Sequence, residues 1–471
     1  MSVLDTPPQD EVVTTITATT HVELPLHPKK PTYDELNPKS SPTEFLGPWG
    51  TLAVTLLTPL FCNLLFIGCN ERTGCPPSWN RAEGRLEFSR YDFSLMVDKL
   101  FDGKAFLVYI GWYTYMVLCW AYIPGDWVEG TLMRNGKKQM YKINAFSTLL
   151  LTAGLMIIPM STSKGQEGLS WLYDHWLGLV NASILMAIFQ SVWVYSWSFQ
   201  SGELLAKGGN SGVFIYDFFM GRPLNPTPPG YPEFDIKQFN ELRPGLILWL
   251  VLNVACLCEQ SIRLGGLANV TASMWLVFVM QSLYVVDAVY NETSVLTTMD
   301  ITTDGFGFML AIGDLAWVPF TYTLQARYLA FNPVRLSALS VIGIVATEAT
   351  GYYIFRSSNW EKDAFRSGRN PRNLDFIATK RGTKLLTSGW WGRSRHPNYF
   401  GDWLMALAWC LPTGLNTPIT YFYLVFFVIL LLHRQIRDDE ACKEKYGSDW
   451  DRYCEKVPYR IIPYVVSSRS V

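Results

Sequence analysis

Charged residues are scarce in this chain. Asp, Glu, Lys and Arg make up 17% of its 471 residues, whereas soluble globular domains average about 25%. So little charge beside a hydrophobic content of 49% is typical of a protein whose solvent is a lipid bilayer. The formal net charge is −1, so the chain as a whole does not attract nucleic acid, and recognition of an anion requires local clusters of Lys and Arg.

Several common functional motifs are also missing. The sequence contains no GxGxxG, GxxxxGK[ST], HExxH or GxSxG pattern, so we expect no Rossmann domain. Its nine cysteines show no paired CxxC spacing, which predicts packing residues rather than a disulfide framework or a metal site. No basic stretch precedes an apolar run at the N-terminus, so we expect no cleaved signal peptide.

Ten apolar stretches define the predicted fold. They lie near residues 47–69, 105–124, 145–161, 171–199, 244–260, 270–290, 305–330, 335–355, 400–413 and 418–433. Because a helix needs about 20 residues to cross the hydrocarbon core, we predict an all-α polytopic membrane protein with eight to ten transmembrane helices. The last two stretches are short and close together, which predicts a helical hairpin whose outer ends face the same compartment.

The distribution of basic residues predicts the orientation of the chain. Residues 356–396 contain ten Lys or Arg and three Asp or Glu, and an excess of basic residues is typical of cytosolic loops. We therefore expect a disordered polar tail over residues 1–45, transmembrane helices over 46–355, and a C-terminal half over 356–471 with the hairpin and a cytosolic end.

One polar cluster follows the last apolar stretch. If the run FFVILLL continues as a helix, Arg434, Asp438, Cys442 and Lys445 or Tyr446 share one face at spacings of three and four. Such a face could bind a ligand. The alternative is a solvated helix held by ion pairs between residues four apart, and the spacing alone favours that alternative.

A second cluster lies in TKRGTKLLTSGWWGRSRHPNYFGD, where basic residues surround Trp390, Trp391 and Tyr399. Aromatic planes beside cations suit a nucleobase or nicotinamide and its phosphates, but an interfacial aromatic belt has the same composition. Lys362 and Arg366 are four apart; they could hold a phosphate or could form a plain exposed helix face.

Acidic residues within or beside apolar segments form a third set. Asp287, Asp300 and Asp304 belong to it, and ionisable groups at membrane depth usually face a cavity or a partner. Tyr216 and Asp217 lie between apolar segments. They could line the same cavity or cap the loop that follows them.

Four segments carry a family resemblance. They are GGNSGVFIYDFFMGRPLNP, TTMDITTDGFGFMLAIGDLAWVPFTYTLQARYL, TKRGTKLLTSGWWGRSRHPNYFGDW and LLHRQIRDDEACKEKYGSDWDRY. Through them, and over residues 46–465, the chain resembles the sterol reductases of the endoplasmic reticulum, most closely their fungal Δ14 branch. The lamin B receptor shares this membrane domain but has a long basic N-terminal region. The polar 45 residues here disfavour a role in the nuclear lamina.

The resemblance implies a ten-helix enzyme that binds NADPH through its C-terminal half, with a sterol cavity among the upstream helices. Carried onto matching positions, the implied cofactor contacts are Lys362, Arg366, Leu386, Trp391, Asn398, Tyr399, Asp438, Cys442, Lys443, Glu444, Lys445, Tyr446 and Tyr453, with Arg434 nearby. Both polar clusters are included, so the resemblance favours the functional interpretation of each.

The implied reaction is the NADPH-dependent reduction of the Δ14 double bond of a sterol intermediate in ergosterol-type biosynthesis. An isolated alkene accepts hydride only after protonation, so the enzyme needs an acid as well as the cofactor. Protonation leaves a tertiary cation at ring carbon 14, which the hydride quenches. The candidate catalytic residues are Tyr284, Asp287, Asp300, Asp304 and Tyr322.

The resemblance further implies a multi-pass protein of the endoplasmic reticulum membrane whose cofactor site faces the cytosol. The expected partners are the sterol substrate, membrane lipid and other enzymes of the sterol pathway, and no nucleic acid. Within the family the alternative is a Δ24(28)- or Δ7-sterol reductase. Outside it the alternatives are a transporter and an isoprenylcysteine-type methyltransferase, whose cofactor S-adenosylmethionine has no phosphate for Lys362 and Arg366 to bind.

Overall fold

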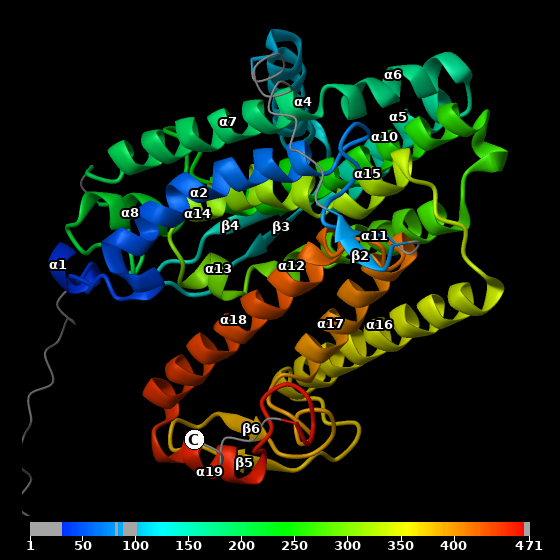
Figure 1. Cartoon of the computed structure of the whole chain (residues 1–471). Helices are drawn as coiled ribbons and strands as arrows, with labels where there is room; N and C mark the ends of the chain where they lie inside the picture. The colour runs from blue at the N-terminus through cyan, green and yellow to red at the C-terminus, as the bar shows by residue number, and fades with distance from the viewer. Residues whose placement is uncertain (1–30, 81–82, 88–100, 201, 466–471) are drawn as a thin grey trace, which may run out of the picture.

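The computed structural model describes residues 31–80, 83–87, 101–200 and 202–465 (Figure 1). Its helices are α1 (Tyr33–Leu36), α2 (Gly47–Gly68), α4 (Gly103–Tyr122), α5 (Ala145–Met160), α6 (Ser163–Asp174), α7 (Trp176–Trp197), α8 (Phe214–Met220), α9 (Ile236–Asn240), α10 (Leu246–Leu264), α11 (Ala272–Tyr290), α12 (Glu292–Val295), α13 (Met299–Thr302), α14 (Phe308–Ile312), α15 (Leu324–Phe331), α16 (Ala338–Arg366), α17 (Pro397–Cys410), α18 (Phe422–Tyr446) and α19 (Ser448–Lys456). Three antiparallel strand pairs accompany them: β1 (Ser78–Asn80) with β2 (Arg85–Glu87), β3 (Asp126–Glu129) with β4 (Met140–Ile143), and β5 (Phe376–Ala378) with β6 (Lys384–Leu386).

Seven helices of the described chain are long and apolar enough to cross a membrane. They are Glu44–Gly68, Gly103–Tyr122, Trp176–Trp197, Ile236–Leu264, Ala272–Tyr290, Ala338–Arg366 and Ile419–Tyr446, and α5 is a shorter apolar helix. The all-α polytopic class is therefore confirmed. The seven long helices and the shorter α5 make eight apolar helices in the described chain, which is the lower end of the predicted eight to ten spans.

The remaining two predicted spans are short or broken. Residues 400–413 contain α17, which has 14 residues. Residues 305–330 divide into α14, the π-helix η4 (Gly313–Thr321) and α15. Pro319 lies inside η4 and has no N–H to donate to a regular α-helical ladder. Hydropathy detects the apolar character of both stretches but not the interruption of their backbone.

The helices form two groups. In the larger group α10 lies at the centre and packs against α6, α11, α15 and η4, and its side chains are almost all buried. In the smaller group α17 packs between α16 and α18, and α17 and α18 form a hairpin. The end of the smaller group that carries α19 and the β5–β6 pair lies below the larger group in Figure 1.

The N-terminal segment is only partly as predicted. Residues 1–30 of the predicted disordered tail lie outside the described chain. For residues 31–45 the prediction of disorder is wrong: α1 begins with a capping box between Thr32 and Glu35, and the Asn37 side chain accepts a hydrogen bond from the Leu205 N–H at 2.8 Å. Its polar composition favoured disorder, but this segment finds partners on a distant loop.

The prediction that all nine cysteines are packing residues is also wrong for two of them. Cys69 and Cys75 form a disulfide, with Cα atoms 4.1 Å apart. Cys69 is the C-cap of α2, and the chain after it turns back toward the helix end, so Cys75 meets it. Of the seven free cysteines, five are buried, as packing residues should be.

Candidate functional site

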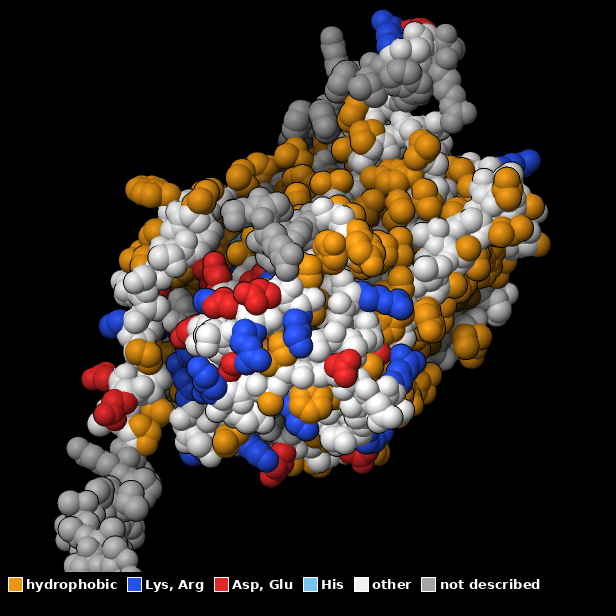
Figure 2. All heavy atoms as spheres, turned by 90° about the horizontal axis from the view of Figure 1, so that it is seen from below, with side chains coloured by type: hydrophobic (Ala, Val, Ile, Leu, Met, Phe, Trp, Pro, Cys, Tyr) orange, Lys and Arg blue, Asp and Glu red, His pale blue; other side chains and the backbone are white. Residues whose placement is uncertain are grey.

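The residues implied as cofactor contacts come from six places in the smaller helical group. They lie on α16 (Lys362, Arg366), on β6 (Leu386), in the turn before α17 (Trp391), on α17 (Asn398, Tyr399), on α18 (Arg434, Asp438 and Cys442 to Tyr446) and on α19 (Tyr453). Figure 2 views the molecule from below; basic and acidic side chains gather over the central and lower part of this face, while hydrophobic side chains dominate its upper part and right side.

Trp391 is the most firmly held member of this set. Its indole N–H donates to the Ser358 carbonyl at 2.8 Å, and its own carbonyl accepts from the Tyr453 hydroxyl at 3.2 Å. The Lys362 ammonium lies 3.8 Å from the centroid of the Trp391 ring, which is within cation–π range. The structure thus brings together three predicted contacts, Lys362, Trp391 and Tyr453, from α16, the turn and α19.

A second group lies between α17 and α18. The Tyr399 hydroxyl donates to Asp438 at 2.9 Å, and Arg434 interacts electrostatically with both of these residues. Asp438 and Cys442 in turn interact with Lys362. The predicted helical face of Arg434, Asp438 and Cys442 therefore exists, because α18 is continuous from Phe422 to Tyr446, and it is directed at the Lys362–Trp391 pair.

Two polar atoms at the start of α17 are buried without a hydrogen-bond partner among the described residues: Asn398 Oδ1 and His396 Nε2. Burial, together with the positive charges of Lys362 and Arg395, lowers the pKa of His396 from 6.5 to about 3. Its ring is therefore neutral at physiological pH. Buried polar atoms are normally satisfied, so these two can form hydrogen bonds with a ligand or water between α16 and α18.

The structure does not gather the whole predicted set. Lys443, Glu444 and Lys445 are exposed on the outer side of α18, as is Arg366 at the end of α16. The Lys443 ammonium forms an ion pair with Asp451 instead. None of these four side chains is arranged around a ligand, and Glu444 carries the same sign of charge as a phosphate.

The predicted acids Asp300 and Asp304 are engaged in ion pairs with α18. Asp300 lies 3.3 Å from Arg434, and Asp304 lies 2.7 Å from Arg437. The Lys237 ammonium donates to the Asp304 carbonyl at 2.7 Å and so fixes the backbone of this acidic segment. These ion pairs join the larger helical group to α18.

Tyr284 and Tyr322 belong to a cluster of aromatic rings from five elements. Ring centroids are 5.9 Å apart for Tyr284 and Trp249, 5.1 Å for Tyr284 and Trp409, and 4.4 Å for Tyr322 and Tyr423. Tyr322 is buried and Tyr284 is partly exposed. Tyr284 also interacts electrostatically with Asp402, Asp287 and Arg434.

Asp287 lies at the edge of this region, where it accepts from the Tyr352 hydroxyl at 3.0 Å and pairs with Arg356 at 3.4 Å.

A residue that the sequence interpretation missed is Asp402 on α17. Its Oδ1 is buried and makes no hydrogen bond to the described chain, and it interacts with Arg434 and Asp287. The signal was available, because Asp402 is a carboxyl inside an apolar stretch. No group of metal-ligating side chains occurs in the described residues.

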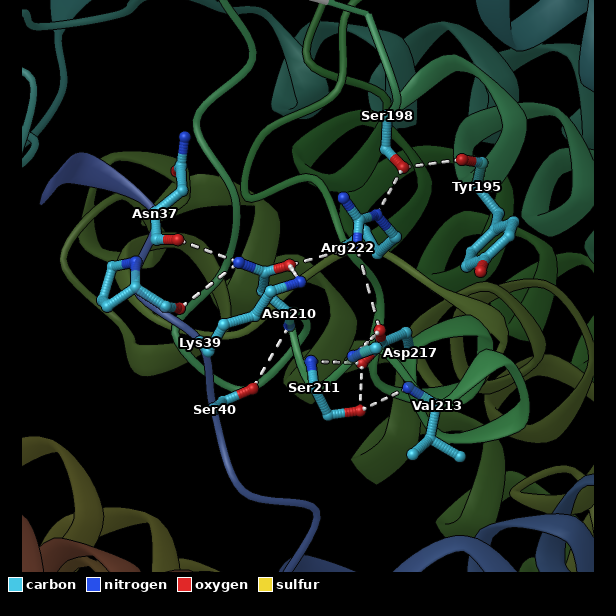
Figure 3. Close-up of polar contacts among 12 residues, drawn as sticks. Asn37, Lys39, Ser40, Tyr195, Ser198, Asn210, Ser211, Val213, Asp217 and Arg222 are labelled. Carbon is cyan, nitrogen blue, oxygen red and sulfur yellow. Dashed lines mark hydrogen bonds and ion pairs between the residues drawn. The ribbon is translucent and has the colours of Figure 1, made fainter. Parts of the chain in front are cut away.

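The segment GGNSGVFIYDFFMGRPLNP receives the N-terminal chain (Figure 3). The Asn210 amide donates to the Asn37 carbonyl at 2.9 Å and accepts from Arg222 at 3.2 Å. Asp217 accepts from the Ser211 N–H at 2.8 Å. Asp217 therefore caps the loop before α8, whereas the sequence interpretation had it cap the loop that follows.

Glycines of the same segment cross those of DGFGF. Gly221 has φ +89°, and a Cβ there would come within 2.4 Å of the Gly307 nitrogen; a Cβ at Gly305 would come within 1.9 Å of the Gly221 oxygen. Only glycine permits this backbone approach. The crossing places Asp304, which directly precedes Gly305, where it can reach Arg437.

Comparison with known proteins identifies relatives over almost the whole chain. The family model described as "Ergosterol biosynthesis ERG4/ERG24 family" matches residues 39–466. The chain is 47% identical to the Delta(14)-sterol reductase erg24 of Schizosaccharomyces pombe, over 90% of this chain and 97% of that protein. It is 42% identical to the Delta(14)-sterol reductase ERG24 of Saccharomyces cerevisiae, over 91% and 99%. The Delta(14)-sterol reductase LBR of Gallus gallus is 41% identical over 92% of this chain and 65% of its own length.

Proposed function

Because this chain belongs to the ERG4/ERG24 family of sterol reductases, it reduces the Δ14 double bond of a sterol in ergosterol biosynthesis, and we propose that its reductant is NADPH bound between α16 and α18. The observation that carries the proposal is the convergence of Lys362, Trp391, Tyr399 and Asp438 beside the unpartnered Asn398 oxygen. A cation over a buried ring suits an aromatic, phosphorylated cofactor.

The residues present fit the parts of such a cofactor. Lys362 and Arg366 supply positive charge for phosphates, and Asn398 Oδ1 can accept from an amide or hydroxyl. NADPH, when bound, supplies the hydride. The protein contributes orientation: Arg434 pairs with Asp300 on one side and interacts with Asp438 and Tyr399 on the other, so it lies where the cofactor group meets the aromatic cluster.

We assign the proton transfer to Tyr284. Asp300 and Asp304 each form an ion pair with an arginine of α18, so their carboxyl groups are already engaged in joining the two helical groups. The Tyr284 ring, by contrast, belongs to the aromatic cluster, and its hydroxyl carries a proton that it can donate. In this arrangement Tyr284 protonates the alkene, and the buried Asp402 carboxyl, with which it interacts electrostatically, returns a proton to the tyrosine.

The experiment uses the purified protein, NADPH and a panel of sterols with Δ14, Δ7 or Δ24(28) double bonds. We expect reduction at Δ14 alone. Tyr284→Phe should slow turnover at least 100-fold, because general acid catalysis contributes 10²–10⁴-fold, whereas Tyr290→Phe, on the same helix but 68% exposed, should have little effect. Full activity of Tyr284→Phe would exclude it as the donor. Use of NADH with equal efficiency would contradict the cofactor proposal.

We further propose that the cofactor site faces the cytosol of an endoplasmic reticulum protein. Disulfides form on the oxidising side of that membrane, which supports a lumenal position for the Cys69–Cys75 turn. The Thr417 hydroxyl, in the hairpin loop, donates to the Cys75 carbonyl at 2.6 Å, so this loop lies on the same side. The opposite ends of α17 and α18 then lie in the cytosol, in agreement with the excess of basic residues over 356–396. A C-terminal tag digested by protease in intact microsomes would support this orientation, and a protected tag would contradict it.

A further inference from the structure

A buried carboxylate next to the cofactor group has no part in the reaction as described so far. Glu361 lies on α16 directly before Lys362, and its side chain is 2% exposed. It accepts a hydrogen bond from the Trp390 N–H at 2.7 Å and from Arg372 at 3.1 Å. A buried carboxylate that accepts a backbone N–H fixes the position of that backbone strongly, because an ionised acceptor makes short and strong hydrogen bonds.

The turn around Trp390 is shaped to fit this carboxylate. Gly389 has φ +67°, and a Cβ built on it would come within 2.5 Å of the Glu361 Oε1 atom. A side chain at position 389 would therefore displace the carboxylate, as well as straining the backbone. The turn is closed by the Gly392 N–H, which donates to the Ser388 carbonyl at 3.1 Å.

The next residue in this turn is Trp391, whose ring lies beneath the Lys362 ammonium. Three residues on the last turns of α16 hold this part of the turn. The Ser358 carbonyl accepts from the indole N–H of Trp391, the Glu361 carboxylate accepts from the backbone N–H of Trp390, and the Lys362 ammonium lies over the Trp391 ring. The spacing of three between Ser358 and Glu361 puts both on one side of the helix. The Trp391 ring therefore has its position set from α16 at two points besides Lys362.

We infer that Glu361 is a positioning residue for the cofactor site: its carboxylate holds the 388–392 turn so that Trp391 presents its ring beneath Lys362. The inference rests on the proposed function, since it assumes that this group binds NADPH. In this role Glu361 acts through the Trp390 N–H and not by direct contact with NADPH. Its loss should change the binding of NADPH while the proton-transfer residues, which lie on other helices, remain intact.

The test compares Glu361→Ala, Glu361→Gln and Asp363→Asn in the purified full-length protein. Glu361→Ala should raise the Kd and the KM for NADPH at least tenfold, with kcat at saturating NADPH within about threefold of the parent. Glu361→Gln retains an oxygen that can accept from the Trp390 N–H, so it should recover most of that loss. Asp363 is two residues away, 77% exposed and 3.8 Å from Arg369, so its neutralisation controls for the loss of one negative charge and should leave both constants unchanged.

Gly389→Ala provides a second route that leaves Glu361 in place. It should reproduce the increase in KM, because the added methyl group occupies the position of the carboxylate. Unchanged NADPH binding in Glu361→Ala and Gly389→Ala would overturn the inference, as would a loss of turnover and melting temperature with no change in KM. Failure of the parent protein to bind NADPH would instead contradict the proposed function, so the two failures are distinguishable.

Discussion

The ion pair between Asp304 and Arg437 tests how the two helical groups are joined. Arg437 donates to both oxygens of Asp304, at 2.7 and 3.4 Å, and lies 3.5 Å from Glu44. The side chains are 7% and 21% exposed, so the pair is largely shielded from water. A hydrogen bond to a charged group contributes about 1.5–3 kcal/mol. Because Glu44 still neutralises part of the Arg437 charge, we expect Asp304→Asn to cost about 2 kcal/mol.

We expect this cost to appear as a higher Kd for NADPH. Arg437 is the neighbour in sequence of Asp438, which lies on the face of α18 that we propose binds the cofactor. A cost of about 2 kcal/mol corresponds to about 30-fold in Kd. The assay is a double-mutant cycle of Asp304→Asn and Arg437→Gln, with the Kd for NADPH and the turnover of the Δ14 sterol measured for each protein. The double variant should bind no more weakly than either single variant, which gives a coupling of about 1–2 kcal/mol.

Two results would refute this reasoning. Effects on Kd that add within about 0.5 kcal/mol would show that the two residues do not act together. If Asp304→Asn instead slowed turnover by about 100-fold or more, equally in both Arg437 backgrounds, Asp304 would be identified as the general acid. Glu129→Gln is a suitable control, since its partner Lys138 lies at 2.7 Å but both side chains are exposed, and exposed pairs contribute less than about 1 kcal/mol.

Three further predictions concern other parts of the molecule. Gly221→Ala should destabilise the protein by about 3 kcal/mol, because its Cβ would meet the backbone around Gly307. Gly212 also has a positive φ, +84°, but open space around it, so Gly212→Ala should cost only about 1 kcal/mol. The melting temperatures of the two variants distinguish these costs, and equal losses would contradict the crossing of the two glycine segments. The pKa of His396 is about 3 in the folded protein and about 6.5 in the unfolded chain. As the pH falls below about 6.5 the unfolded state therefore binds the proton first, and the free energy of unfolding should decrease. His396→Gln should flatten the decline in melting temperature between pH 7 and pH 5. Deleting residues 1–30 should leave sterol reduction within about twofold, but deleting residues 1–46 removes the contacts to the 203–222 loop and to α18 and should lower activity at least tenfold; equal activity of the two truncations would contradict a role for this segment.

Much of the arrangement around the proposed cofactor site could be predicted from the sequence. The shared face of Arg434, Asp438 and Cys442 follows from helical periodicity, which is a property of neighbouring residues. The residues alone singled out Trp391 and Tyr399 but left their cluster undecided between a ligand site and an aromatic belt. The resemblance added Asn398 and favoured the ligand site.

The roles of the acids could not be predicted in the same way. Asp300, Asp304 and Glu361 were equivalent as carboxylates in the sequence. What separates them is the partner that each meets: Arg434 and Arg437 for the two aspartates, and a backbone N–H with Arg372 for the glutamate. The role we propose for the two aspartates changes from acid catalysis to the joining of helices, because each is engaged by an arginine of α18.

The sequence by itself determined that the chain is a helical membrane protein with a charged C-terminal end, because hydropathy, helical periodicity and the bias of basic residues depend only on nearby residues. The tertiary structure alone decided that residues 31–45 are ordered, that Cys69 meets Cys75, and that the acidic segment pairs with α18. The disulfide spans only six positions but needs the turn that the chain makes after α2. The other contacts join residues up to 173 positions apart, and their existence depends on the path of the whole backbone, to which a local pattern is insensitive.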